Sequence, residues 1–212
     1  MLVCSCPVGA AIPTITIVDC PRKFGQTQKL LFQRIYSSGT TKNSIADEAT
    51  VLLLATWTAL LAAEDGTKVQ ISPFVENPQN EPGEAKKTGG GNESLDGIEI
   101  IVGRGATMFT AQFNNKSQES IADIKDLMCE NIGVYLIDNQ GQIGYSLGSD
   151  DKAYPIPIHQ MFVADLTLGG LEDNDYNLLE FAFKGNWSDT FRFAQATAFD
   201  PLTDLTNPSE SS

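Results

Sequence analysis

Histidine, cysteine and basic residues are scarce in this chain of 212 residues. It has one histidine and four cysteines, and its 14 lysine and arginine residues face 27 acidic ones, which gives a formal net charge of -13. Such an acidic surface is not suited to neutralising nucleic-acid phosphates. The charge therefore argues against sequence-specific nucleic-acid binding, although DNA can still move past an acidic wall.

The cysteines show no paired spacing. Cys4, Cys6, Cys20 and Cys129 match neither a disulfide framework nor a four-ligand zinc site. We interpret them as free, buried thiols in a reducing cytoplasm. Cys4 and Cys6 are the one close pair, and a shared metal is the alternative for them.

Long apolar runs and nucleotide-binding motifs are also missing. The most apolar stretch, residues 49–63, is too short to span a bilayer and is flanked by acidic residues. The apolar start lacks the basic region of a secretory signal, so we expect no signal peptide and no membrane association. Neither Gly89–Gly91 nor Gly103-x-Gly105 completes a phosphate-binding motif, so no cofactor is expected.

Two helices are predicted. Ser44 and Asp47 have the spacing of a capping box, and a helix over about residues 45–64 should follow, apolar on all sides and therefore covered on more than one. The second helix, over about 118–130, places Ile121 and Ile124 on a buried stripe. Between them, residues 77–97 are so rich in Pro, Gly and charge that they predict a long flexible loop.

Most of the remaining chain predicts strands joined by turns. Ile98–Val102 and Thr107–Phe113 are expected to form a hairpin across residues 103–105, and a second hairpin should turn at 138–141. A further strand alternates from Leu178 to Trp187. The fold class is therefore α+β, an antiparallel β-sandwich or barrel with two helices.

The chain divides into an N-terminal arm over residues 1–43, one α+β sandwich domain over 44–199 and a flexible tail over 200–212. The arm contains a predicted strand, Ile12–Val18, and four of the few basic residues: Arg22, Lys23, Lys29 and Arg34. Such an arm could dock on an acidic neighbouring subunit, or it could be an ordinary strand with solvated charges.

No catalytic constellation emerges. His159 and Cys129 could form a thiol nucleophile and its base, but nothing in the sequence brings them together, and no third group is identifiable. We therefore expect no catalytic residues. Acidic pairs in the predicted loops, such as Asp150 and Asp151, are solvated by default.

The segment E-D-N-D-Y-N-L is the one candidate metal site. Asp173, Asp175 and Asn177 alternate as in a calcium loop, but Leu178 occupies the position that needs glycine, and Lys184 occupies the position that needs glutamate. An EF-hand is excluded. The alternatives are a looser oxygen-rich cation site and turn-forming side chains that cap backbone amides.

Several segments carry a family resemblance. The order L-A-T-W-T-A-L-L-A-A, K-V-Q-I-S-P, a Gly-rich stretch, I-A-D-I-K-D-L, N-I-G-V-Y-L-I-D-N-Q-G-Q-I-G and F-A-F-K-G-N-W resembles tail and ring proteins of crAss-like bacteriophages of Bacteroides-type hosts. The N-terminal P-V-G-A-A-I-P and D-C-P-R-K-F-G-Q-T-Q-K-L-L-F-Q-R are similar to the same proteins.

The resemblance implies a tail-tube-like fold and a non-enzymatic virion structural protein of the tail or neck, made in the host cytoplasm. It implies a homo-oligomeric ring of six- or twelve-fold symmetry that contacts neighbouring tail or neck proteins and surrounds the DNA passage. A ring would also pair strand edges that are otherwise exposed. The alternative function is a carbohydrate- or cation-binding β-sandwich module that uses the 148–157 and 169–177 loops.

Overall fold

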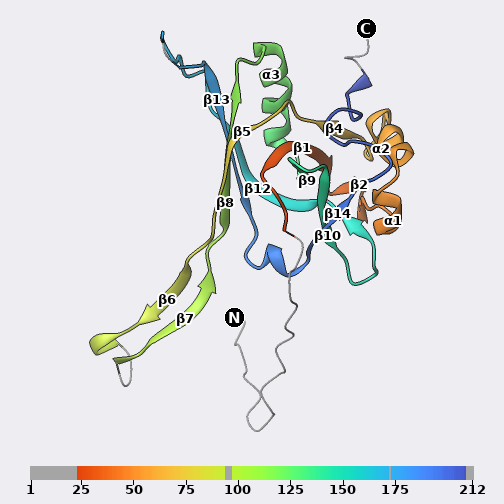
Figure 1. The fold of residues 1–212 in the computed structure, drawn as a ribbon. Helices are drawn as coiled ribbons and strands as arrows, with labels where there is room; N and C mark the ends of the chain where they lie inside the picture. Colours follow the sequence, from red (N-terminus) through yellow and green to blue (C-terminus); the bar gives the residue numbers. More distant parts are fainter. Residues whose placement is uncertain (1–22, 94–96, 172, 209–212) are drawn as a thin grey trace.

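A bent antiparallel sheet forms the body of the protein (Figure 1). The computed structural model describes residues 23–93, 97–171 and 173–208, and every pairing between their named strands is antiparallel. The strands of this sheet are β1 (Thr27–Arg34), β4 (Val69–Ile71), β5 (Glu76–Glu81), β8 (Thr107–Asn114), β9 (Ile132–Asp138), β10 (Gln142–Leu147), β11 (Ala153–Tyr154), β12 (Ile156–Val163), β13 (Tyr176–Phe183) and β14 (Phe191–Gln195). The predicted α+β antiparallel sandwich is confirmed.

Shorter elements surround this sheet. Two separate ribbons pair β2 (Tyr36–Ser38) with β3 (Thr41–Lys42) and β6 (Ala85–Gly89) with β7 (Glu99–Arg104). The helices are α1 (Glu48–Val51), α2 (Leu54–Leu61) and α3 (Gln118–Asp126), with 3-10 turns η1 (Gly91–Glu93), η3 (Leu127–Cys129) and η4 (Trp187–Asp189).

Strand β12 links the two halves of the sandwich. Its first residue, Ile156, pairs with Val134 in β9, whereas its last, Val163, pairs with Leu179 in β13. The register shifts between these pairs, and Gln160 there has a φ of 55°. A bulge of this kind bends a strand and increases its twist. The half formed by β12, β13, β8 and β5 therefore folds over the half that contains β1 and β9.

Strand β9 is buried on both faces because it lies between two cores. Val134 and Leu136 face the core between the two halves of the sheet, together with Phe109 and Phe181 of the opposite half. Tyr135 faces the second core, where α1 and α2 cover the outer side. Helices α1 and α2 thus form one outer layer, and the two halves of the sheet form the other two. Strand β9 lies in the middle layer and contributes to both cores.

Strand β1 and residues 200–208 belong to the same body. Strand β1 is hydrogen-bonded to β4 on one side and β9 on the other, so the boundary expected at residue 43 does not separate two packing units. Leu205 is completely buried, and the amide of Asn207 bonds to the backbone of Ile71, so residues 200–208 pack as part of the body rather than as a flexible tail. Ile12–Val18 lies outside the described residues.

The single helix predicted over 45–64 is wrong, because the chain breaks it at Leu52 and Leu53. The first cap is Asp47, not Ser44: its carboxylate accepts a 2.7 Å bond from the backbone N–H of Thr50. Val51 and Trp57 would lie roughly 120° apart around a continuous helix. The break lets both enter one core, and the Trp57 indole N–H donates to the Val51 carbonyl at 2.8 Å.

The second predicted helix is close to the observed one. Helix α3 begins after Ser117, whose Oγ accepts from the Ser120 backbone N–H, and its residues Ile121 and Ile124 are buried as expected. It ends at Asp126 and continues as the 3-10 turn η3, so the last residues of the predicted 118–130 helix are wound more tightly.

The long flexible loop predicted over 77–97 is wrong, as is the hairpin predicted across residues 103–105. Strand β5 pairs with β8, and β6 pairs with β7, so one long hairpin runs from Glu76 to Asn114. Its far half, β6 and β7, projects away from the body, and we call these two strands the arm (Figure 1). The composition predicts a loop because residues 77–97 are rich in Pro, Gly and charge. In the structure the polar residues of this segment nevertheless pair, in β5 with β8 and in β6 with β7.

Candidate functional site

Two glycines position the arm at its junction with the body. A side chain at Gly83 would place its Cβ 2.3 Å from the carbonyl oxygen of Gly105, so only glycine fits this crossing. The backbone N–H of Gly105 donates to the Glu84 carbonyl at 2.7 Å. At the same end, the Arg104 guanidinium donates to Asn186 Oδ1 at 2.9 Å. The arm therefore leaves the sheet in a direction set by contacts on both of its strands.

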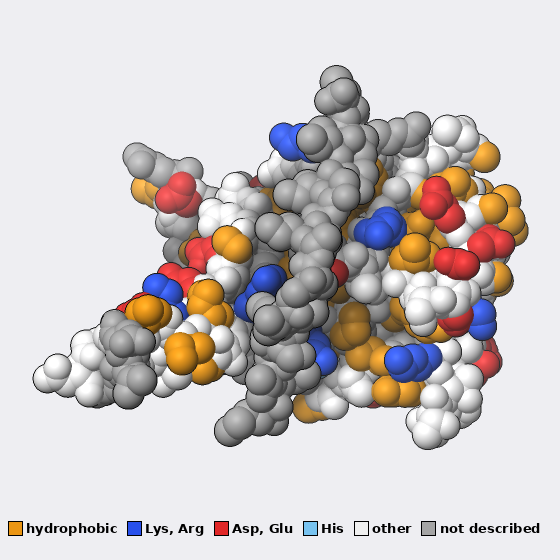
Figure 2. Space-filling view, turned by 90° about the horizontal axis from the view of Figure 1, so that it is seen from below, with side chains coloured by type: hydrophobic (Ala, Val, Ile, Leu, Met, Phe, Trp, Pro, Cys, Tyr) orange, Lys and Arg blue, Asp and Glu red, His pale blue; other side chains and the backbone are white. Residues whose placement is uncertain are grey.

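The arm exposes an apolar strand. Ile98, Ile100, Ile101 and Val102 are each between 62% and 64% exposed. Ile100 is paired with Thr88, and Ile101 with Lys87, and because successive strand residues point to opposite faces, both faces of β7 are apolar. Figure 2 shows hydrophobic side chains gathered on the projection at its left. Exposed apolar surface on a projecting strand is typical of a protein-protein contact.

The arm also carries most of its charge as cations. Lys86, Lys87 and Arg104 stand on β6 and β7 against one acidic residue, Glu99. Lys87 Nζ lies 3.0 Å from the Glu99 carboxylate. The excess of basic residues is confined to the two paired strands, since Glu84 precedes β6 and Glu93 lies in η1 at the tip of the same hairpin.

A second exposed apolar segment lies in the connection from β12 to β13. Leu166, Leu168 and Leu171 in this connection are exposed, and Phe162 near the end of β12 is exposed as well. We call the described residues 164–171 and 173–175 the β12–β13 connection. Its charged residues are Asp165, Asp173 and Asp175, with no basic residue among them.

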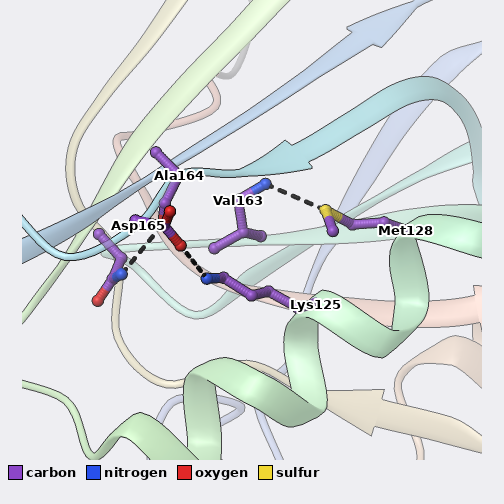
Figure 3. A network of polar contacts seen from close by, with 6 residues as sticks. Lys125, Met128, Val163, Ala164 and Asp165 are labelled. Atoms are coloured by element: carbon purple, nitrogen blue, oxygen red, sulfur yellow. Dashed lines mark hydrogen bonds and ion pairs between the residues drawn. The ribbon is translucent and has the colours of Figure 1, made fainter.

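Helix α3 and the following 3-10 turn η3 hold the start of this connection (Figure 3). Lys125 Nζ lies 2.7 Å from Asp165 Oδ1, and this contact lowers the pKa of the Asp165 carboxyl. Next to it, the Val163 backbone N–H donates to the Met128 sulfur at 3.3 Å. The exposed leucines are thus presented from an anchored base.

The E-D-N-D-Y-N-L segment positions backbone in the structure. Asp175 Oδ1 accepts from the Gly169 backbone N–H at 2.9 Å, and Asn177, almost fully buried, donates from Nδ2 to the Ala164 carbonyl at 3.0 Å. Asp173 is exposed beside them. Among the described residues, no group of three or more His, Cys, Asp and Glu side chains could hold a metal ion. Asp175 thus accepts from a backbone amide as the turn-forming alternative expects, whereas Asn177 lies in β13 and donates to a backbone carbonyl.

The other candidate residues are spread over the molecule. Cys129 ends η3 and is exposed, which corrects the expectation of a buried thiol, and His159 is exposed on β12 opposite Ala182. Both residues are described, and no hydrogen bond joins them. Cys4, Cys6 and Cys20 lie outside the described residues.

The loops proposed for a ligand-binding module are also separated. The 148–157 loop precedes β12 and the 169–177 loop follows it, so the eight-residue strand stands between them. At about 3.3 Å per residue, this is a separation of roughly 20 Å. The first loop lines a pocket of about 440 Å³, in which the Tyr154 hydroxyl donates to Asp150 at 2.8 Å and lowers the pKa of that carboxyl. The two loops therefore lie at opposite ends of β12.

Comparison with known proteins gives little information about the role of these surfaces. No family model and no curated protein matches the chain. A solved chain from the tail of an empty GTA particle with C6 symmetry is similar over 58% of this chain and 87% of its own length, with 13% identity and a TM-score of 0.33. A likeness at this TM-score establishes neither a shared fold nor a shared function, and none of the comparisons points to crAss-like phages in particular. No helix in the described part of the chain is long and apolar enough to cross a membrane.

Proposed function

We propose that this chain is a non-enzymatic structural protein of a phage-type virion, and that its copies associate into a ring or stacked rings in a tail or neck. The observation that carries the proposal is the arm: a projecting hairpin whose strand β7 exposes three β-branched apolar residues, Ile100, Ile101 and Val102, on two faces. A monomer gains nothing from such a strand, whereas an assembly buries it.

The charge of the chain fits a passage for DNA. A net charge of -13 repels phosphates, so DNA would slide along an acidic lumen without binding. Closed rings would also cover sheet edges such as β5, which pairs with β8 alone among the described strands.

Sedimentation velocity and negative-stain microscopy of the full chain test the proposal. We expect rings or short stacks at micromolar concentrations, alone or after addition to purified tail particles. Ile100→Glu should weaken this association about tenfold or more, because it places a charge in the buried contact. Leu53→Glu alters an apolar residue exposed at the α1–α2 break and is the matched control.

Two results would overturn the proposal. One is a wild-type chain that stays monomeric up to its solubility limit and does not join particles. The other is association of the Ile100→Glu variant as strong as that of the wild type, which would show that the arm is not part of the contact. Calorimetry with calcium, for wild type and Asp173→Ala, checks the cation-binding alternative in parallel, and no heat is expected.

A further inference from the structure

The two exposed apolar segments lie at opposite ends of one sheet. Strand β8 begins at Thr107, paired with Phe183, next to the arm, and ends at Asn114, paired with Tyr176, next to the β12–β13 connection. Eight residues of strand separate the two ends by roughly 25 Å. Figure 1 shows the arm leaving the body at one end of β8 and the connection standing beyond the other. Within one chain, the arm therefore does not meet the connection.

The two segments are complementary in charge as well as apolar. Strands β6 and β7 carry Lys86, Lys87 and Arg104 against Glu99, whereas the β12–β13 connection carries three aspartates and no basic residue. Lys87 is already paired with Glu99, which leaves Lys86 and Arg104 as the excess of positive charge. On the connection, Asp165 is held by Lys125, and Asp173 is exposed. Opposite charges beside an apolar centre favour one docking orientation.

We propose that the arm of one copy docks on the β12–β13 connection of a second copy. Ile100 and its neighbours on β7 would pack on Leu168 and Leu171, with Lys86 near Asp173. This inference rests on the proposed function and names the partner surface that it requires. Because the two surfaces differ, the contact is heterologous: each copy keeps one free arm and one free connection, so copies add head to tail along the direction of β8.

Chemical cross-linking gives the first test. A carbodiimide joins an amine directly to a carboxylate, and the opposite placement of Lys86 and Asp173 makes a cross-link within one chain impossible. We expect a Lys86–Asp173 cross-link between copies, identified in a mixture of normal and nitrogen-15-labelled protein by its mixed-isotope mass. Leu53→Glu should leave this cross-link unchanged, and Leu168→Glu should reduce it about tenfold or more.

Mixing two variants gives the decisive test. Ile100→Glu keeps an intact connection and Leu168→Glu keeps an intact arm, and both changes fall on side chains more than 60% exposed, so folding should persist. Each variant alone should be monomeric. An equimolar mixture should form a one-to-one pair and nothing larger, since only one intact contact can form.

The remaining outcomes separate this inference from the proposed function. If Ile100→Glu blocks association and Leu168→Glu does not, the arm docks elsewhere, for example on a second arm, and only the inference falls. If the two variants fail to pair on mixing, the heterologous contact is likewise overturned. If the wild-type chain shows neither association nor the cross-link, both proposals fall.

Discussion

The backbone N–H of Gly25 donates a 2.7 Å hydrogen bond to Oδ2 of Asp138, a side chain with no solvent exposure. The same carboxylate accepts from the backbone of Gln140 and Gln142 and from the Gln142 side chain. One buried carboxylate thus closes the β9–β10 turn and fastens the start of β1 to it.

Asp138→Asn should lower the free energy of unfolding by about 2 to 4 kcal/mol, because an amide turns one acceptor into a donor that faces other donors. Urea denaturation measures the loss. Asp123→Asn, on the exposed face of α3, makes the same chemical change without these partners and should cost less than about 0.5 kcal/mol. Equal losses in both variants would contradict a structural role for Asp138.

Gly83→Ala should loosen the arm, since the added Cβ would lie 2.3 Å from the Gly105 carbonyl. We expect faster hydrogen exchange in β6 and β7 while the exchange of β9 stays unchanged. Gly103→Ala is the matched control on the same hairpin, because its Cβ would meet nothing closer than 4.0 Å. Unaltered exchange in Gly83→Ala would show that the crossing does not set the arm.

Trp57→Phe should destabilise the fold by about 2 to 4 kcal/mol, because it leaves the Val51 carbonyl without its donor and creates a void beside Tyr135. Trp187→Phe removes the same volume from a half-buried ring that stacks on Phe183, and its loss should be smaller. Thermal and urea unfolding compare the two. A larger loss for Trp187→Phe would contradict the importance of the bond across the helix break.

Alkaline pH should destabilise the protein through Tyr145. Burial, followed by the nearby Glu48 carboxylate, raises the pKa of Tyr145 to about 12. In the unfolded chain the tyrosine pKa is about 10. Above that value the unfolded state loses its proton first, so stability is constant below about pH 10 and falls from there up to the folded pKa.

Tyr145→Phe removes this ionisation and should flatten part of the fall in the free energy of unfolding between pH 10 and 12. Tyr135, whose pKa burial raises further, accounts for the slope that remains. Urea denaturation across this range gives both curves. Identical slopes for the variant and the wild type would show that Tyr145 titrates normally.

Local patterns predicted much of the sandwich. The buried stripe of α3, with Ile121 and Ile124, followed from helical periodicity, and the β9–β10 turn followed from its polar residues and Gly141. The α1–α2 break did not, because it depends on Val51 and Trp57 reaching the same core, a requirement that helix propensity does not contain.

The candidate site was harder to predict for the same reason. Residues 77–97 have the composition of a loop, and their pairing with residues 99–112 depends on register over a long hairpin, which local sequence does not specify. The sequence predicts a strand at the isoleucines of β7, but only their exposure in the fold makes them a candidate contact.

The sequence by itself determined the antiparallel α+β class, the acidic character and the exclusion of an EF-hand at Asp173, because these depend on composition, alternation and spacing. Only the tertiary structure decided that Asp175 and Asn177 bond to backbone, that the hairpin projects as an arm, and that its apolar strand lies at the opposite end of β8 from Leu168. Those features arise from which distant segments pair, and pairing is settled by the packing of two shared cores.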